Sequence, residues 1–186
     1  MIASAPTKDL SQATRDSQDA IERNYECVID EAGLERWLKK IESSALTAVD
    51  TETTSLDALA AELVGISLSV KPGEACYIPV AHRNGDVQLD RDLVLERMKS
   101  WLESEAHLKV GQNLKYDAHI FANYGITLKG VAFDTLLESY VLESHLPHNM
   151  DSLAERHLGM KTIRYEEVCG KGVHQIGFDQ VDLKIA

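Results

Sequence analysis

Apolar residues recur at two spacings along this chain, and each spacing predicts a different element. Alternation of apolar and polar residues over 25–29 (YECVI) predicts a short strand, and apolar runs at 46–51, 63–70 and 75–80 predict three more. The turn sequence Lys71-Pro72-Gly73 separates the last two runs. We therefore expect a meander of three strands.

Spacings of three and four residues predict helices. The first, from Glu31 to Ile41, places Leu34, Trp37, Leu38 and Ile41 on one face. Further helices are expected at 90–103, at 113–124 with Gly125 as its left-handed cap, and at 134–144. A short buried strand (LKVG) is expected directly before the helix at 113–124. Ser152 and Glu155 have the form of a capping box, and Gly159 should end the helix that they begin.

These elements predict one α/β domain in a chain of 186 residues. Residues 1–24 mix polar and charged side chains, and we expect them to form a linker or disordered arm that joins a neighbour on its N-terminal side; the domain itself then covers 25–186. No apolar stretch reaches the roughly 18 residues of a membrane helix, so we expect no membrane contact and a cytosolic protein.

Charge and cysteine content narrow the function classes. A net charge of −11 argues against direct binding of nucleic-acid phosphates through Lys and Arg. Clustered carboxylates can instead hold Mg²⁺ or Mn²⁺, which meet the phosphates. The 3 cysteines are widely separated and support neither a disulfide framework nor a structural zinc site.

Two carboxylates interrupt the first strand of the meander, in the sequence AVDTETTSL. Side chains at i and i+2 of a strand point to one face about 6.6 Å apart, so Asp50 and Glu52 should project together. Such a pair repels, and a divalent cation bound to both would remove the repulsion. The alternative is a pair of solvated acids at a strand end.

The segment VGQNLKYD supplies a third acid. Asn113 and Asp117 are four residues apart and share a helix face. The alternative makes Asn113 a helix cap and Asp117 a surface charge. His145, His148 and Asp151 have a spacing that suggests zinc, but Pro147 interrupts the helix that would align them, and we interpret them as solvated loop residues.

Taken together, these motifs resemble the DEDD-type 3′→5′ proofreading exonuclease domain of bacterial DNA polymerase I. The resemblance rests on DTET, QNLKYD and FDTLLESYVL and runs from about Tyr25 to Ala186 through AELVGISLSV, YIPVAH, ANYGI, MDSLAERHLG and KTIRYEEVCGKG. It implies a ribonuclease-H-like fold, in which helices flank a central mixed β-sheet.

The resemblance also implies roles for the three acids. Asp50 would bridge two divalent ions, which would be Mg²⁺ or Mn²⁺, with Zn²⁺ as an alternative at one site. Glu52 would bind the first ion and orient the attacking water. Asp117 would bind the second ion. Two such ions can hold the nucleophile and the leaving oxygen of a phosphodiester hydrolysis. The implied reaction removes a deoxynucleoside monophosphate from the 3′ end of single-stranded DNA.

Substrate contacts are implied at matching positions only. They are Thr53, Leu56, Gln112, Asn113, Tyr116 and Tyr165. Leu56 would lie against the terminal bases, or alternatively fill the core, and Tyr165 would pack on the terminal nucleotide. Asp134 we interpret as the N-cap of the following helix.

The chain departs from the family pattern at its end. The third motif, a tyrosine followed four residues later by aspartate, has no counterpart before Ala186. We therefore expect this fragment to be weakly active or inactive. In the parent chain, the resemblance implies a polymerase domain on the C-terminal side, a 5′ nuclease domain as a candidate neighbour on the N-terminal side, and a bacterial, nucleoid-associated location. Two alternatives stay open: a catalytically dead structural or single-strand-binding module, and an exonuclease directed at RNA.

Overall fold

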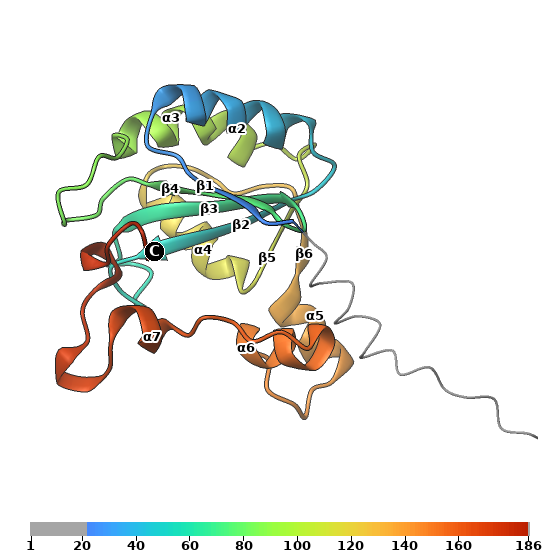
Figure 1. The fold of residues 1–186 in the computed structure, drawn as a ribbon. Helices are drawn as coiled ribbons and strands as arrows, with labels where there is room; N and C mark the ends of the chain where they lie inside the picture. The colour runs from blue at the N-terminus through green and yellow to red at the C-terminus, as the bar shows by residue number, and fades with distance from the viewer. Residues whose placement is uncertain (1–21, 186) are drawn as a thin grey trace, which may run out of the picture.

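The computed structural model describes residues 22–185, so most of the expected arm (1–24) lies outside the described residues. A six-stranded sheet in the order β1-β4-β3-β2-β5-β6 forms its centre (Figure 1). The strands are β1 Asn24–Cys27, β2 Thr47–Thr53, β3 Leu63–Lys71, β4 Glu74–Pro79, β5 Lys109–Gly111 and β6 Val131–Asp134.

The sheet is mixed, as predicted. β2, β3 and β4 pair antiparallel and form the expected meander, while β1 pairs parallel with β4, and β5 and β6 continue the other side in parallel. Parallel pairing brings the C-terminal ends of β2, β5 and β6 to the same end of the sheet. Any side chains that follow these strands are therefore gathered there.

Helices cover the sheet. They are α2 Glu31–Ser43, α3 Arg91–Leu102, α4 Leu114–Asn123, α5 Thr135–Leu142, α6 Met150–Leu153, the π-helical turn η1 Ala154–Leu158, α7 Tyr165–Cys169, and the short turns η2 Gly172–His174 and η3 Phe178–Gln180. α2 and α3 lie side by side above the sheet, and α5, α6 and α7 lie below it (Figure 1). Between residues 22 and 185 no helix has both the length and the apolar character of a membrane span.

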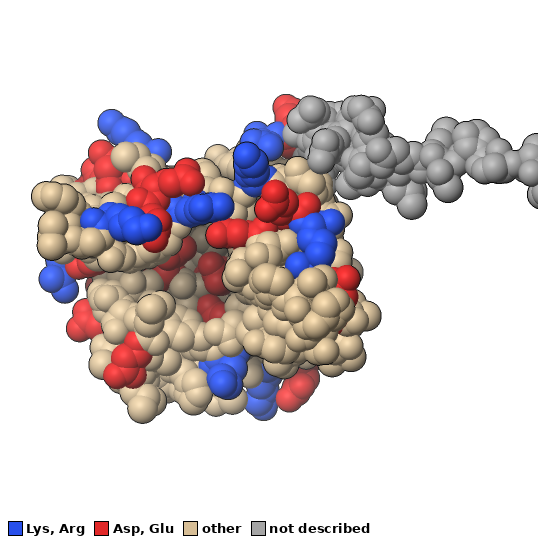
Figure 2. All heavy atoms as spheres, turned by 90° about the horizontal axis from the view of Figure 1, so that it is seen from below, with Lys and Arg blue, Asp and Glu red and all other residues tan. Residues whose placement is uncertain are grey.

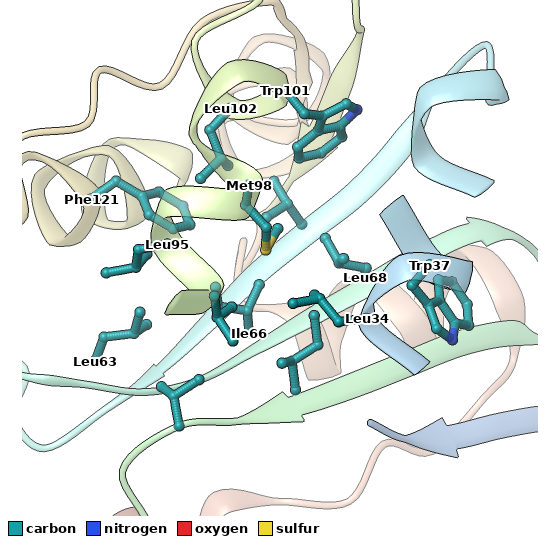
Figure 3. Close-up of a cluster of buried hydrophobic side chains, with 14 of the residues drawn as sticks. Leu34, Trp37, Leu63, Ile66, Leu68, Leu95, Met98, Trp101, Leu102 and Phe121 are labelled. Carbon is teal, nitrogen blue, oxygen red and sulfur yellow. The ribbon is translucent and has the colours of Figure 1, made fainter. Parts of the chain in front are cut away.

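The main core lies between the sheet and the helices α2, α3 and α4. Trp37, Met98 and Phe121, one from each helix, are almost completely buried against Ile66 and Leu68 of β3 (Figure 3). These are the residues that the helical spacing places on one face, and their burial follows from the loss of water-exposed apolar surface. The core thus fixes β2 and β3 beneath three helices.

A smaller apolar cluster lies on the opposite face. It combines Val64 of β3 with Cys169, Phe178 and Val181 from the C-terminal segment. This contact holds the chain after α7 against the sheet, close to the end of β2.

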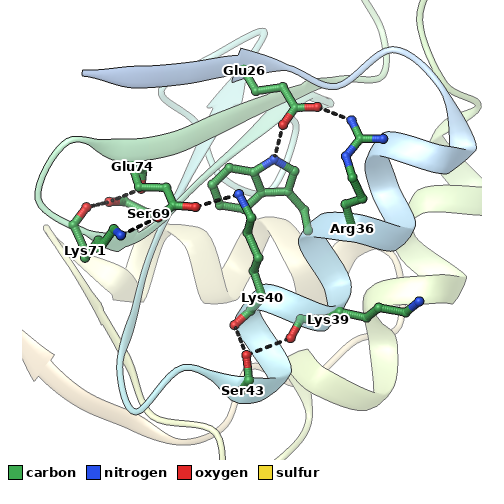
Figure 4. Close-up of polar contacts among 9 residues, drawn as sticks. Glu26, Arg36, Lys39, Lys40, Ser43, Ser69, Lys71 and Glu74 are labelled. Atoms are coloured by element: carbon green, nitrogen blue, oxygen red, sulfur yellow. Dashed lines mark hydrogen bonds and ion pairs between the residues drawn. The ribbon is translucent and has the colours of Figure 1, made fainter. Parts of the chain in front are cut away.

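The edge strand β1 is held to α2 by charged hydrogen bonds. Glu26 accepts hydrogen bonds from Trp37 Nε1 at 2.8 Å and from the Arg36 guanidinium at 2.5 Å (Figure 4). Lys40, on the next turn of α2, donates to Glu74 of β4 at 2.6 Å. The Glu26 contacts thus join β1 to α2, in addition to the backbone pairing of β1 with β4.

One strand was not predicted, and one helix start was misplaced. Residues 131–134 form strand β6 directly before the expected helix, and the first three of these side chains are exposed, which leaves no buried pattern in the sequence. The cap of α6 is Asn149, whose side chain accepts from Ser152 N at 2.9 Å, so Ser152 lies inside the helix that it was expected to begin. Gly159 does end this segment in a left-handed conformation.

His148 corrects a third interpretation. Its ring is buried rather than solvated, stacks on Tyr140 and lies 2.8 Å from the hydroxyl of Ser139 through Nδ1. This contact holds the loop after α5 against that helix. A satisfied, buried histidine explains the residue without a metal.

Candidate active site

Strand β2 sends its side chains alternately to the two faces of the sheet. Val49 and Thr51 are buried on the side of the main core, whereas Asp50 and Glu52 are partly exposed on the other side. The pairing register with β3 shifts directly after Glu52, where the regular ladder ends. The two acids therefore project from one face near the C-terminal end of β2, as the spacing predicts.

Asp134 fixes the start of the neighbouring helix α4. Its carboxylate accepts hydrogen bonds from the backbone N–H groups of Asn113 at 3.1 Å and Leu114 at 2.9 Å. The same carboxylate accepts from Leu136 N at 3.0 Å, so it also caps α5 as predicted. Asn113 takes the N-cap position of α4 with φ 63° but makes no side-chain cap. One carboxylate thus orders two helix starts at the same end of the sheet.

The first turn of α4 delivers Asp117 to β2. Its side chain is 2% exposed and accepts a hydrogen bond from the Thr51 hydroxyl at 2.7 Å. The alternative in which Asp117 is a surface charge is therefore wrong. A buried carboxylate at this position lies beside the strand that carries the other two acids.

The three carboxyl groups affect one another electrostatically. Burial, together with the charges of Asp50 and Asp117, raises the pKa of Glu52 to about 7. The pKa of Asp117 is raised to about 6, mainly by burial, although the Thr51 hydroxyl opposes the shift and the charge of Asp50 adds to it. Burial also raises the pKa of Asp50. Carboxyl groups with raised pKa values at the end of a sheet are typical of a functional site.

The carboxylate oxygens of Asp50, Glu52 and Asp117 suit a divalent cation, but the three side chains do not converge closely enough to surround one. Carboxylate oxygens are the ligands of Mg²⁺ and Mn²⁺, and a bound cation would offset the burial and repulsion that raise these pKa values. Among residues 22–185, however, no three His, Cys, Asp or Glu side chains lie close enough together to hold a metal ion. Thr51 explains part of this, because it points away from Asp50 and Glu52 and engages Asp117 on its own side of the strand.

A hollow adjoins Asp50 on the lower face of the sheet. It has a volume of about 270 Å³ and lies between Ser67 of β3, Gln112, Thr135 and Met150. In Figure 2 this face is concave, with acidic atoms visible in its floor. The small side chains of β2 and β3 leave room here for a ligand that reaches Asp50.

The loop after β2 presents Leu56 to solvent. Leu56 is 96% exposed, which excludes the alternative that it fills the core. Tyr116 of α4 holds this loop, because its hydroxyl donates to Ser55 O at 2.5 Å and lies 2.5 Å from the Thr53 hydroxyl. Thr53 and Tyr116 therefore act on the conformation of the loop, in addition to any contact with substrate.

The remaining predicted substrate contacts, Gln112, Asn113 and Tyr165, differ in how far they are engaged within the protein. Gln112 lines the hollow and donates to His148 O at 2.8 Å, so its amide is partly engaged within the protein, whereas Asn113 is exposed. Tyr165, the first residue of α7, is half exposed, and its pKa is raised to about 12 by burial, by Cys169 and by the charge of Glu52. Tyr165 thus lies within electrostatic reach of the acidic cluster although 113 residues separate it from Glu52.

Sequence reasoning did not identify Thr51 or the second role of Asp134 as parts of this region. Thr51 could have been found, because a hydroxyl between two acids on a strand must face the opposite side. The second role of Asp134 depends on contacts with Asn113 and Leu114, which are remote in sequence, and no local pattern in FDT reports them.

Comparison with known proteins identifies the family. A family model described as 3′-5′ exonuclease matches residues 25–181. DNA polymerase I of Pseudomonas aeruginosa is 52% identical over 170 residues, covering 89% of this chain and 19% of that protein. DNA polymerase I of Rhizobium leguminosarum is 40% identical over 179 residues, covering 86% and 18%. The chain spans about a fifth of the length of these relatives.

Solved structures agree on the fold. Trypanosoma brucei RNase D in complex with RNA U12 matches with a TM-score of 0.63 at 17% identity, covering 81% of this chain and 52% of that one. The POL domain of Pol1 from M. smegmatis, in complex with DNA primer-template and dNTP, matches with a TM-score of 0.61 at 22% identity, covering 73% and 23%. This chain belongs to the 3′-5′ exonuclease family and has its ribonuclease-H-like fold. Enzymes of this family generally depend on divalent metal ions.

Proposed function

We propose that this chain is the proofreading exonuclease module of a DNA polymerase I and removes deoxynucleoside monophosphates from the 3′ end of single-stranded DNA. The observation that carries this proposal is that Asp50 and Glu52 share one face of β2 while Asp117 is hydrogen-bonded to Thr51 of the same strand. The likeness to two DNA polymerase I sequences over more than 85% of the chain supports DNA rather than RNA as the substrate.

In this proposal Asp50, Glu52 and Asp117 are the catalytic and metal-binding residues for two Mg²⁺ or Mn²⁺ ions, with Zn²⁺ as an alternative at one site. When bound, the ions supply an activated water and neutralise charge on the phosphate. Asp117 accepts the Thr51 hydrogen bond through Oδ1, so its other carboxylate oxygen would be the one to bind an ion. The three carboxyl groups would then lose their protons, because a cation favours the charged form.

The other residues position the end of the strand. Leu56 offers an exposed apolar side chain to the terminal bases, and Tyr165 a half-exposed ring on which a base can stack, which is worth about 1–3 kcal/mol. Gln112 lines the hollow next to Asp50, and Asn113 follows it at the surface. Thr53 and Tyr116 keep the Leu56 loop in place.

The experiment is a hydrolysis assay with 5′-labelled single-stranded oligonucleotides at saturating Mn²⁺, because only three carboxylates are assigned to the site and a weakly held ion would otherwise limit turnover. We expect slow release of dNMP from the 3′ end, abolished in Asp50→Asn. Asp90→Asn is the matched control, because Asp90 only caps α3 through Leu93 N. Equal rates in wild type and Asp50→Asn contradict the proposal, and faster cleavage of a matched RNA oligonucleotide contradicts the choice of DNA.

A further inference from the structure

Gln112 lies where two hollows meet. The hollow beside Asp50 has a volume of about 270 Å³, and a second hollow of about 400 Å³ lies between α5, α6 and η1. The side chains of Gln112, Thr135 and Met150 line both of them. A ligand that extends from Asp50 into the second hollow therefore passes the side chain of Gln112.

The amide of Gln112 is held at both ends. Its Nε2 atom donates to the carbonyl oxygen of His148 at 2.8 Å, and its Oε1 atom accepts from the hydroxyl of Thr135. A carbonyl oxygen only accepts, so the NH₂ group has to face His148 and the amide oxygen has to face Thr135. The opposite orientation would place two acceptor oxygens against each other. The two partners thus fix one orientation of the amide.

Thr135 reaches Gln112 because two strands pair in parallel. Gly111 of β5 lies opposite Asp134 of β6, so the next residue of each strand, Gln112 and Thr135, is also placed side by side. The Thr135 hydroxyl lies 3.2 Å from the carbonyl oxygen of Gly111 as well. Both of its partners are acceptors, so the Thr135 hydroxyl acts as a donor here.

The carbonyl of His148 belongs to a loop that is held by contacts of its own. The buried ring of His148 lies 2.8 Å from the Ser139 hydroxyl through Nδ1. Arg156 donates to the carbonyl oxygen of the preceding residue, Pro147, at 3.2 Å. The acceptor that faces Gln112 is therefore kept in place by α5 and η1, and Thr135 completes the support from the other side.

One N–H of the Gln112 amide is left for a ligand. The NH₂ group carries two protons, and among residues 22–185 only the carbonyl of His148 accepts from it. Because Gln112 lines the hollow beside Asp50, the second N–H can donate to an oxygen of a molecule bound there. Phosphate oxygens of a nucleic-acid strand are charged acceptors, and hydrogen bonds to charged groups are about twice as strong as neutral ones. Such a contact holds the strand without reading its bases.

We propose that Thr135 is a positioning residue, which holds the Gln112 amide so that its second N–H donates to a phosphate oxygen of the strand in the hollow beside Asp50. This inference rests on the proposed function and deepens it, because it adds a residue outside the three acids and outside the predicted substrate contacts. In this role Thr135 acts only through Gln112, and that dependence can be measured.

Hydrolysis by variants of the whole chain tests the proposal. In the Mn²⁺ assay, Thr135→Val removes the hydroxyl at nearly the same volume, so we expect KM for the oligonucleotide to rise about threefold to tenfold with kcat unchanged. Thr135→Ser keeps the hydroxyl and should restore the wild-type KM. Thr135→Ala serves as a second variant without the hydroxyl if valine disturbs the start of α5. Thr127→Val is the matched control, because Thr127 is exposed between α4 and β6 and lines neither hollow.

The dependence on Gln112 is tested by combining variants. Gln112→Ala removes the contact itself and should raise KM about tenfold or more. When Gln112→Ala is already present, Thr135→Val should have no further effect, because the two residues act as one unit. An equally large rise in KM in that background overturns the inference, and so does an unchanged KM, or a loss confined to kcat, in Thr135→Val alone.

A second measurement needs no turnover. In nitrogen–proton NMR spectra, the side-chain amide resonances of Gln112 should move in Thr135→Val and stay close to their wild-type positions in Thr135→Ser and Thr127→Val. Unchanged amide resonances in Thr135→Val contradict the support that the hydroxyl is inferred to give.

Failure of the proposed function can be told apart from failure of this inference. If wild type shows no Asp50-dependent hydrolysis, the proposed function is wrong. Fluorescence anisotropy of a labelled single-stranded oligonucleotide then supplies Kd in place of KM. The same pattern of Kd among the variants would support the contact of Gln112 with the strand, whereas equal Kd values in wild type and Thr135→Val, or no binding at all, would overturn it.

Discussion

Replacing Asp134 by alanine should weaken two helix starts at once. The carboxylate accepts from Asn113 N, Leu114 N and Leu136 N at 2.9–3.1 Å, and from Leu137 N at 3.4 Å. Loss of one N-cap costs about 1 kcal/mol on average. Two helices lose theirs here, so we expect the free energy of unfolding to fall by about 2–3 kcal/mol.

The assay is urea and thermal unfolding of the whole chain, compared with Asp90→Ala. Asp90 caps one helix through one bond to Leu93 N at 3.0 Å, so its loss should cost only about 1 kcal/mol. For a domain of this size, 1 kcal/mol shifts Tm by about 2–4 °C, which puts the expected decrease for Asp134→Ala at about 4–12 °C. Asp134→Asn keeps one acceptor oxygen and should lie between. A loss for Asp134→Ala no larger than for Asp90→Ala would refute the idea that one carboxylate orders both helices.

Three further predictions follow from the site and its surroundings. The pKa of Glu52 is raised from 4.5 to about 7 in the folded state, so between these pH values the folded protein holds a proton that the unfolded chain releases. In the absence of metal, the free energy of unfolding should therefore fall by at most about 3 kcal/mol between about pH 4.5 and pH 7. Urea unfolding in EDTA at pH 5 and pH 8 checks this: the decrease should be smaller in Glu52→Gln, and an equal decrease in both proteins speaks against the shift. Tyr116→Phe releases Ser55 and Thr53 and should raise KM for single-stranded DNA severalfold with little change in kcat; a change confined to kcat would argue for a role in the chemistry instead. Gly130→Ala should lower stability by more than 1 kcal/mol, because φ is 68° there and a Cβ would lie 2.4 Å from His107 O; unchanged thermal unfolding would show that the turn can adapt.

Much of the fold follows from periodicity. The helix at Glu31–Ser43 and the meander of β2, β3 and β4 have strongly patterned burial, because each packs one face on a large core. Strand β6 lacks this pattern: Val131 and Phe133 are almost half exposed at the sheet edge, so only its pairing with β5 defines it. Asn149 was missed as a cap because Ser152 and Glu155 imitate a capping box three residues later.

The candidate site was predictable in part. The alternation of β2 places Asp50 and Glu52 on one face from sequence alone. The direction of the Asp117 side chain depends on Thr51, and the second helix capped by Asp134 depends on the pairing of β5 with β6. These contacts join residues more than 20 positions apart, and no local spacing encodes them.

The most direct test of the central claim is a calorimetric Mn²⁺ titration of this chain near pH 7 in two buffers of different ionisation heat. If Asp50, Glu52 and Asp117 bind the cation, wild type should bind Mn²⁺ with release of protons, since the raised pKa of Glu52 leaves it about half protonated at this pH. Asp50→Asn and Glu52→Gln should each bind more weakly, and Glu52→Gln should release fewer protons. Binding that is equally strong in both variants, with the same proton release as wild type, would mean that these three acids are not the cation site.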